Sequence, residues 1–160
     1  MSREVRARLK AIASLITPGA SVADVGTDHG YLPLYLVRSG LCKRVTACDI
    51  SENCVARAAA NIAEAGLSDV ISCVLSDGLS AVDSALYDTV VIAGMGGETI
   101  IEILSAAELH GKKLVLQPNT RQLLLVRSLV ASGFAIEREL YVRDRGRNYY
   151  IVSAKTPEQT

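Results

Sequence analysis

VADVGTDHGYLP, residues 22–33, is the stretch that decides the fold. An apolar run leads into Asp24 and Gly26, and a second apolar segment that could form a helix follows Gly30. A strand, a glycine turn and a helix in this order are typical of the first β-α unit of an open parallel sheet. Ligands of such sheets bind beyond the carboxyl ends of the strands. The stretch therefore predicts an α/β fold and the place of its site.

Strand-like and helix-like segments alternate on both sides of this turn. Apolar residues spaced for one helix face predict an N-terminal helix within residues 1–17. Strands are then expected at 21–26, 44–50, 70–77, 87–95 and 112–118, and helices at 31–39, 52–66, 97–107 and 120–132. Two extended runs, 134–144 and 147–155, leave no room for a helix between them and predict a closing hairpin. Repeated β-α units imply a parallel sheet with helices on both faces, into which the hairpin inserts an antiparallel strand.

Length and composition place the chain among globular proteins. It has 160 residues, of which 49% are hydrophobic and 21% charged, as expected for one folded domain. No apolar run approaches the roughly 20 residues of a membrane span, and the basic N-terminus lacks the apolar core of a signal peptide. We therefore expect a cytoplasmic protein without a membrane partner. The four cysteines show no zinc-ligand spacing, so we interpret them as reduced structural thiols and expect no metal.

The formal net charge is zero, but the charge is distributed unevenly. Residues 51–110 hold nine acidic side chains against the single base Arg57. Arginines gather instead within residues 1–10 and 121–147. A polyanion would meet the two ends of the chain more readily than its middle. Ordinary solvated surface is the alternative interpretation.

Carboxylates follow two further strands. Asp49 closes the second strand, roughly 20 residues after the glycine turn, where a carboxylate can accept hydrogen bonds from both hydroxyls of a ribose. A helix cap is the alternative role, but Ser51 is better placed for it. Asp77 ends the third strand and could accept a hydrogen bond from the exocyclic amine of an adenine. Its alternative is a turn aspartate, because Asp-Gly is a common turn pair.

The glycine turn itself departs from the dinucleotide pattern GxGxxG. It reads GTDHG, and the carboxylate of Asp28 would repel a pyrophosphate. Asp24 and Asp28 instead suit a cofactor that carries positive charge. S-adenosylmethionine has a sulfonium and an α-ammonium group and no phosphate. The chain also lacks GxxxxGK[ST], which excludes a P-loop nucleotide hydrolase.

At this point the chain resembles a known family, the bacterial tRNA (adenine-22-N1)-methyltransferases known as TrmK. The resemblance rests on RLKAIASLITPGASVADVGTDHGYLPLYLV, ACDIS, SDGL, VVIAGMGGETIIEIL and LVLQPN, and it spans nearly the whole chain. It implies a Rossmann-like class I methyltransferase fold, a seven-stranded and mostly parallel sheet in the order 3-2-1-4-5-7-6 with strand 7 antiparallel. Family members carry a helical C-terminal extension, which is absent from these 160 residues. We therefore expect a single methyltransferase domain over 1–160, with an N-terminal helix at 1–17 and a core at 21–156.

The resemblance also implies a function: transfer of a methyl group from S-adenosylmethionine to N1 of an adenine in tRNA, at position 22, with S-adenosylhomocysteine as product. tRNA is then the expected partner and DNA is not. The expected cofactor-binding residues are Asp24, Gly26, Thr27, Gly30, Asp49, Ile50, Asp77, Gly78 and Gly94. The catalytic candidates are Asp28, His29 and Tyr31. The substrate-binding candidates are Met95, Gly96, Gly97, Gln117, Asn119, Arg3, Arg6, Arg8, Arg143, Arg145 and Arg147, the arginines as contacts to phosphates.

The expected chemistry is simple, because adenine N1 carries a lone pair and no proton must leave before attack. Alignment of the reacting atoms and exclusion of water are then what catalysis needs. No side chain of AGMGG, residues 93–97, can accept from an amine, but its glycines would let a flat base come close. A tight turn is the alternative reason for these glycines, and a hydrogen-bonded structural role is the alternative for His29.

Other functions stay open at this level. The chain could bind S-adenosylmethionine without independent activity, or methylate another RNA or a small molecule. An NAD-dependent dehydrogenase is disfavoured by the GTDHG spacing and by the terminal hairpin. The sequence carries no signal for the oligomeric state.

Overall fold

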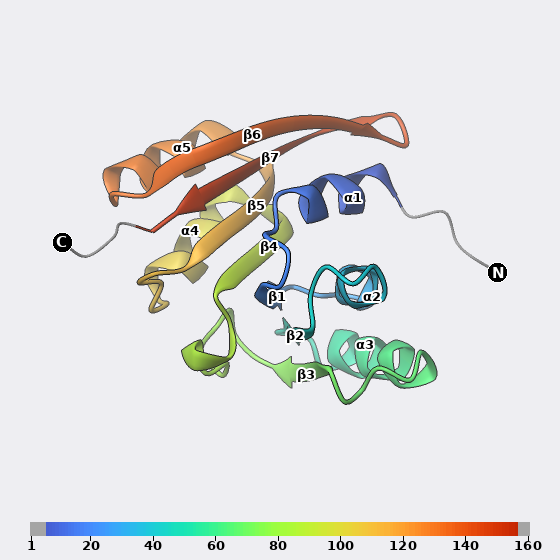
Figure 1. The fold of residues 1–160 in the computed structure, drawn as a ribbon. Coiled ribbons are helices and arrows are strands. Elements are labelled where there is room, and N and C mark those ends of the chain that lie inside the picture. Colours follow the sequence, from blue (N-terminus) through green and yellow to red (C-terminus); the bar gives the residue numbers. More distant parts are fainter. Residues whose placement is uncertain (1–5, 157–160) are drawn as a thin grey trace.

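The computed structural model describes residues 6–156, and it contains one seven-stranded sheet in the order β3-β2-β1-β4-β5-β7-β6 (Figure 1). The strands are β1 (Ser21–Val25), β2 (Arg44–Asp49), β3 (Ile71–Leu75), β4 (Thr89–Gly96), β5 (Lys113–Thr120), β6 (Ala135–Asp144) and β7 (Arg147–Lys155). Neighbours among β1 to β5 pair in parallel, and β7 pairs antiparallel with both β5 and β6. The predicted strand order and the single antiparallel insertion are confirmed.

Helices cover both faces of the sheet. They are α1 (Ala7–Ser14), α2 (Tyr31–Arg38), α3 (Glu52–Glu64), α4 (Gly97–Ser105) and α5 (Gln122–Ala131), together with a short 3-10 turn, η1 (Ser84–Leu86), that the sequence did not indicate. One core cluster lies under α1, α2 and α3, and a second lies under α4 and α5. The N-terminal helix is shorter than predicted, since it ends at Ser14, and the segment 1–5 lies outside the described residues.

Burial on both faces explains the continuous apolar strands. Val90, Val91 and Ile92 of β4 are fully buried, and consecutive residues point to opposite faces. Val91 accordingly joins the cluster under α1, α2 and α3, while Val90 and Ile92 join the cluster under α4 and α5. A strand with helices on both sides needs apolar residues at every position, which is the pattern that identified a parallel sheet.

The β6–β7 hairpin closes with a two-residue turn. Arg145 and Gly146 both have a positive φ, 50° and 79°, as a type I′ turn requires. The turn keeps the long hairpin in register, from Asp144 opposite Arg147 to Ala135 opposite Lys155, apart from one bulge. The hairpin reaches past the sheet beside the start of α1 (Figure 1).

The parallel strands bring their carboxyl ends to one edge of the sheet. From β1 the chain order runs through β2 and β3 on one side and through β4 and β5 on the other. The switch point therefore lies between β1 and β4, where open sheets of this kind form their ligand crevice. The carboxyl ends of β1 to β5 and the turns that follow them meet along this edge, and together they contain most of the predicted site residues.

Candidate functional site

A cavity of about 340 Å³ opens at the carboxyl ends of β1, β2, β3 and β4. Its lining includes six residues that the sequence predicted: Gly26, Asp49, Ile50, Asp77, Gly78 and Met95. The opposite wall comes from α4, which contributes Thr99, Glu102 and Ile103 among others. The sequence analysis missed this wall. Its only signal was the mixed polar and apolar pattern of α4, which is equally typical of any helix packed on a sheet.

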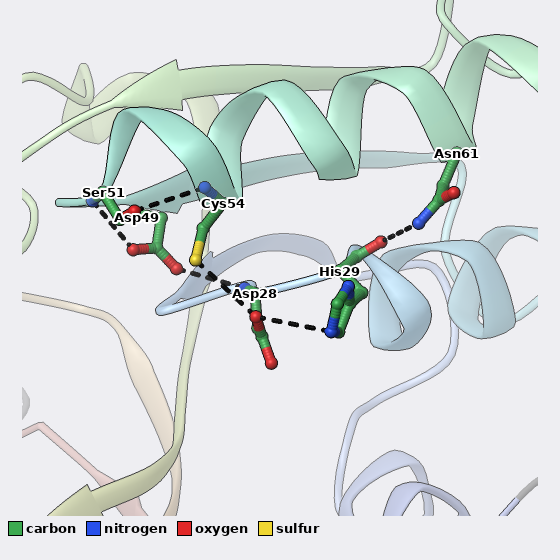
Figure 2. A network of polar contacts seen from close by, with 6 residues as sticks. All are labelled: Asp28, His29, Asp49, Ser51, Cys54 and Asn61. Atoms are coloured by element: carbon green, nitrogen blue, oxygen red, sulfur yellow. Dashed lines mark hydrogen bonds and ion pairs between the residues drawn. The ribbon is translucent and has the colours of Figure 1, made fainter.

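Asp49 is a buried carboxylate of the cavity lining that two backbone N–H groups hold in place. Its side chain is buried, Oδ2 accepts a hydrogen bond from the backbone N–H of Asp28 at 3.1 Å, and Oδ1 accepts one from the backbone N–H of Ser51 at 3.0 Å (Figure 2). Each carboxylate oxygen has a second lone pair. Asp49 can therefore anchor the turn after β1 and still accept hydrogen bonds from a ligand in the cavity. Ser51 caps α3 by accepting from the N–H of Cys54, as predicted.

The turn after β1 is fixed from several directions. The backbone N–H groups of Gly26 and Thr27 donate to the carbonyl of Cys48, and Asn61 of α3 donates through Nδ2 to the carbonyl of His29 at 2.9 Å. Gly26 has φ 75°, and a Cβ at this position would lie 2.4 Å from Cε of Met95. The backbone conformation thus favours glycine here, whereas a Cβ would displace the flexible end of the Met95 side chain.

The three catalytic candidates form one cluster on the α3 side of the turn. Nε2 of His29 lies 3.7 Å from Oδ1 of Asp28, and the rings of His29 and Tyr31 stack with 5.2 Å between centroids. The thiol of Cys54 donates to Oδ1 of Asp28 at 3.6 Å (Figure 2). Asp28 itself has φ 55°, a left-handed conformation held by the hydrogen bond from its N–H to Asp49. The side chains of Asp28 and Tyr31 are exposed, so a substrate can reach them.

Asp24 differs from the other carboxylates because it is buried within β1, only 4% exposed. Burial disfavours its charged form and raises its pKa from 3.8 to about 7, and the negative charge of Asp49 acts in the same direction. The hydroxyl of Thr27 and the guanidinium of Arg8 oppose this shift. Asp24 can therefore change its charge near neutral pH, and a cation bound beside it would favour the ionised form.

Arg8 lies where the sequence analysis did not expect it. It was predicted as a surface contact to phosphate, together with Arg6. Its side chain instead turns inward, where Nη1 donates to Oε1 of Gln117 at 2.9 Å and the guanidinium carbon lies 5.3 Å from the centre of the Tyr149 ring. Nη1 is 3.6 Å from the position that a Cβ on Gly94 would occupy. Gln117 and Tyr149 thus engage the guanidinium of Arg8 in this structure, and the contact of Arg8 to a phosphate stays a prediction.

The other substrate candidates divide into two groups. Gln117 and Asn119 join Arg8, because Nε2 of Gln117 donates to Oδ1 of Asn119 at 3.1 Å. Arg6, Arg143, Arg145 and Arg147 are exposed on the first residues before α1 and at the tip of the β6–β7 hairpin. These two places adjoin, since the backbone N–H of Arg8 donates to Oδ2 of Asp144 at 3.0 Å. Arg3 lies outside the described residues.

The glycines after β4 have a clear packing reason. A Cβ on Gly97 would lie 2.6 Å from the carbonyl oxygen of Arg121, and one on Gly96 would lie 3.0 Å from Oγ1 of Thr120. Backbone atoms cannot yield as a flexible side chain can, so Gly97 is required for β4 and the chain after β5 to approach. Contact of Gly94, Gly96 and Gly97 with a substrate base stays a prediction. Gly30 and Gly78 have positive φ and closely approach Ala58 and Ile103 in the same way.

Comparisons with known proteins place this chain among methyltransferases. Residues 5–152 match the family described as "Methyltransferase domain". The tRNA (adenine(22)-N(1))-methyltransferase of Bacillus subtilis is 33% identical over 155 residues, 95% of this chain and 65% of that protein. The crystal structure of the B. subtilis m1A22 tRNA methyltransferase TrmK superposes with a TM-score of 0.93 at 30% identity, over 98% of this chain and 68% of that one. The chain belongs to the TrmK family of methyltransferases.

A second TrmK structure, that of M. capricolum, was solved in complex with S-adenosylhomocysteine, and it superposes with a TM-score of 0.89 at 31% identity over 98% of this chain and 70% of that one. This chain spans about two thirds of the length of these TrmK relatives. The family resemblance predicted from the motifs is thus confirmed.

Within residues 6–156 no three His, Cys, Asp or Glu side chains gather in a way that could hold a metal ion, and no helix is long and apolar enough to cross a membrane. All four cysteines are free thiols, which agrees with the sequence interpretation.

Proposed function

We propose that the chain transfers the methyl group of S-adenosylmethionine to N1 of an adenine in tRNA, the adenine at position 22 as in the name of the B. subtilis relative. The observation that carries the proposal is the cavity beside Asp49, at the switch point of a TrmK-family fold. We further propose that residues 1–160 act as a single methyltransferase domain.

The cavity suits the adenosine part of the cofactor. A volume of about 340 Å³ lies within the range of pockets that hold small ligands, roughly 300–1,000 Å³. Asp49 would accept hydrogen bonds from both ribose hydroxyls through its second lone pairs, and Asp77 would accept one from the adenine amine. Ile50 is 70% exposed directly beside Asp49, and its side chain would cover one face of the adenine.

The positively charged part of the cofactor would then lie near the turn after β1. The backbone of Gly26 lines the cavity at this end, Asp24 is buried two residues earlier in β1, and Gly94 lies in the neighbouring strand β4. Bound S-adenosylmethionine supplies an electrophilic methyl group on a sulfonium. The chain supplies the carboxylate of Asp24 as a counter-charge, and the side chain of Met95 lies against Gly26 and helps to exclude water.

The target base would approach over the turn from the exposed side. Adenine N1 attacks through its lone pair, and the methylated base becomes cationic. Asp28 offers an exposed carboxylate that can stabilise this charge or accept a proton from the exocyclic amine. Nε2 of His29 lies 3.7 Å from Oδ1 of Asp28, and the Tyr31 ring stacks on the His29 ring. The exposed arginines Arg6, Arg143, Arg145 and Arg147 would contact tRNA phosphates.

The proposal is tested by methyl transfer from labelled S-adenosylmethionine to unmodified bacterial tRNA. A parallel tRNA carries guanine in place of adenine 22, because N1 of guanine bears a proton and offers no lone pair. We expect label only in the first tRNA. Equal labelling of both would contradict the assigned site. No labelling, with thermal stabilisation by S-adenosylhomocysteine and none by NAD, would leave a cofactor-binding core without independent activity.

A further inference from the structure

Arg8, Gln117 and Asn119 form a chain of hydrogen bonds that runs from α1 to the exposed end of β5. We propose that Arg8 is a positioning residue, which fixes the carboxamides of Gln117 and Asn119 so that the amide nitrogen of Asn119 faces the target base. The inference rests on the proposed function in one respect only, that the methyl acceptor lies beyond the end of β4. The orientation of the two carboxamides follows from the contacts alone.

The polarity of the chain is set at Arg8. A guanidinium can only donate hydrogen bonds, so the atom of Gln117 that lies 2.9 Å from Nη1 must be the oxygen. The Gln117 nitrogen then points to the other side, where it donates to the oxygen of Asn119 at 3.1 Å. The remaining group of Asn119, its Nδ2, is therefore turned away from Gln117. Without Arg8, either carboxamide could rotate by half a turn at little cost.

The first two members of the chain are rigidly held. Gln117 is 1% exposed within β5, so its carboxamide needs partners inside the protein. Arg8 is fixed by its backbone hydrogen bond to Asp144 and by the Tyr149 ring beneath its guanidinium. Gln117 is buried and Arg8 is half-buried, whereas Asn119 is exposed and therefore the most accessible to a ligand. Arg8 and Gln117 thus determine the orientation of one exposed amide.

The exposed amide lies at the edge where the base would bind. The ends of β4 and β5 pair with Met95 opposite Pro118 and Gly96 opposite Thr120, so Asn119 lies across from the Met95–Gly96 segment. Met95 lines the cavity. An N–H donor at this place would recognise an acceptor of the base other than N1, such as N7 of adenine, and would leave N1 free to receive the methyl group.

The orientation can be tested without any turnover, by following the side-chain amide resonances of the ¹⁵N-labelled protein. The Asn119 signal is identified by its loss in Asn119→Asp. We expect Arg8→Met to move the Asn119 signal through the intervening Gln117, and Arg8→Lys, which keeps a donor toward Gln117, to restore it. Arg38→Met, an exposed arginine on α2, is the matched control and should leave the signal in place. An unmoved Asn119 signal in a folded Arg8→Met would overturn the proposal.

The consequence for recognition is tested by kinetics at saturating S-adenosylmethionine. We expect kcat/KM for tRNA to fall at least about tenfold in Arg8→Met and in Asn119→Asp, the factor for one well-made hydrogen bond, and to fall no further in the double variant. Asn119→Asp should bind S-adenosylhomocysteine within about twofold of the unchanged protein. Losses that multiply in the double variant, or an equal loss of cofactor affinity, would contradict a role in orienting the base.

The two tests separate this inference from the proposed function. If the unchanged protein methylates no tRNA, the proposed function fails, while the resonance experiment still decides whether Arg8 orients Asn119.

Discussion

On the β1–β2–β3 side of the carboxyl edge, Asp28, Asp49 and Asp77 lie at or just after the ends of their own strands. On the β4–β5 side, Arg8 and Asp144 reach the edge from elements far from β5 in the sequence. Asp49 ends β2 and holds a turn 21 residues earlier. Arg8 holds Gln117 across 109 residues and Asp144 across 136. The first side provides Asp49 and Asp77 of the cavity, whose lining β4 and α4 complete, and the second side provides the proposed contact to the base. Substitutions on the two sides should therefore have separable effects on cofactor binding and on tRNA methylation.

The largest effect is expected for Asp49→Ala. The change removes the acceptor for the proposed ribose contacts and for the N–H groups of Asp28 and Ser51, so S-adenosylhomocysteine affinity should fall by about 100-fold or more. Calorimetry measures the affinity, and Asp69→Ala, an exposed carboxylate before β3, is the matched control. Because the two N–H groups also lose their partner, Asp49→Asn serves as a second variant that keeps one acceptor. Unchanged affinity in Asp49→Ala would refute the ribose assignment.

A pH dependence should follow from Asp24. Its pKa is raised by burial to about 7, so below this pH the carboxyl is neutral and cannot attract a cationic cofactor. S-adenosylmethionine affinity should be highest above pH 7 and should fall by roughly tenfold per pH unit below it. Asp24→Asn should bind weakly and without this dependence. A flat profile in the unchanged protein would show that Asp24 does not face the cofactor's charge.

Asp24 should affect the folding stability of the ligand-free protein in the opposite direction: a rise in pH that strengthens cofactor binding should lower the stability of the fold. Its folded pKa of about 7 exceeds the ordinary value of 3.8, so the folded state binds more protons between these two values. The stabilisation by Asp24 is therefore complete below pH 3.8 and is lost as the pH rises through 7. Urea unfolding of the ligand-free protein against Asp24→Asn measures this difference.

Asp28→Asn should reduce turnover more than cofactor binding. The backbone N–H of Asp28, not its carboxylate, holds the turn to Asp49, so the substitution spares the anchor. We expect kcat on tRNA to fall about tenfold or more, with S-adenosylhomocysteine affinity nearly unchanged. Equal losses in both quantities would make Asp28 a cofactor ligand and not a catalytic residue.

The smallest effect is expected for alanine substitutions of Gly26 and Gly40. Comparing them distinguishes the cost of backbone strain from the effect of a new side chain in the cavity. Gly26 and Gly40 have nearly the same φ, 75° and 76°, but a Cβ on Gly26 would meet Met95, whereas one on Gly40 has nothing within 4 Å. Gly26→Ala and Gly40→Ala should therefore lose similar stability, about 1 kcal/mol each. Only Gly26→Ala should also weaken cofactor binding. Thermal unfolding measures the stability of the two variants, and calorimetry measures their affinity for S-adenosylhomocysteine. A loss of cofactor affinity in Gly40→Ala as large as that in Gly26→Ala would contradict the account.

The contrast between the two sides explains which features the sequence could predict. Strand order, the turn after β1 and the positions of Asp49 and Asp77 follow from local patterns, because in a parallel sheet a residue that ends a strand must lie at the carboxyl edge. The inward turn of Arg8 depends on how α1 packs against the β6–β7 hairpin, and no local pattern records that packing. The α4 wall of the cavity was missed for the same reason.

The most direct test of the account is the identity of the methylated nucleoside. tRNA that has reacted with S-adenosylmethionine and this protein is digested at neutral pH and its nucleosides are separated and weighed by mass spectrometry. We predict 1-methyladenosine, because adenine N1 attacks through its lone pair without losing a proton and so needs no acceptor among the side chains of residues 93–97 at the end of β4. Methylation at the exocyclic amine, or of a nucleoside other than adenosine, would contradict the account.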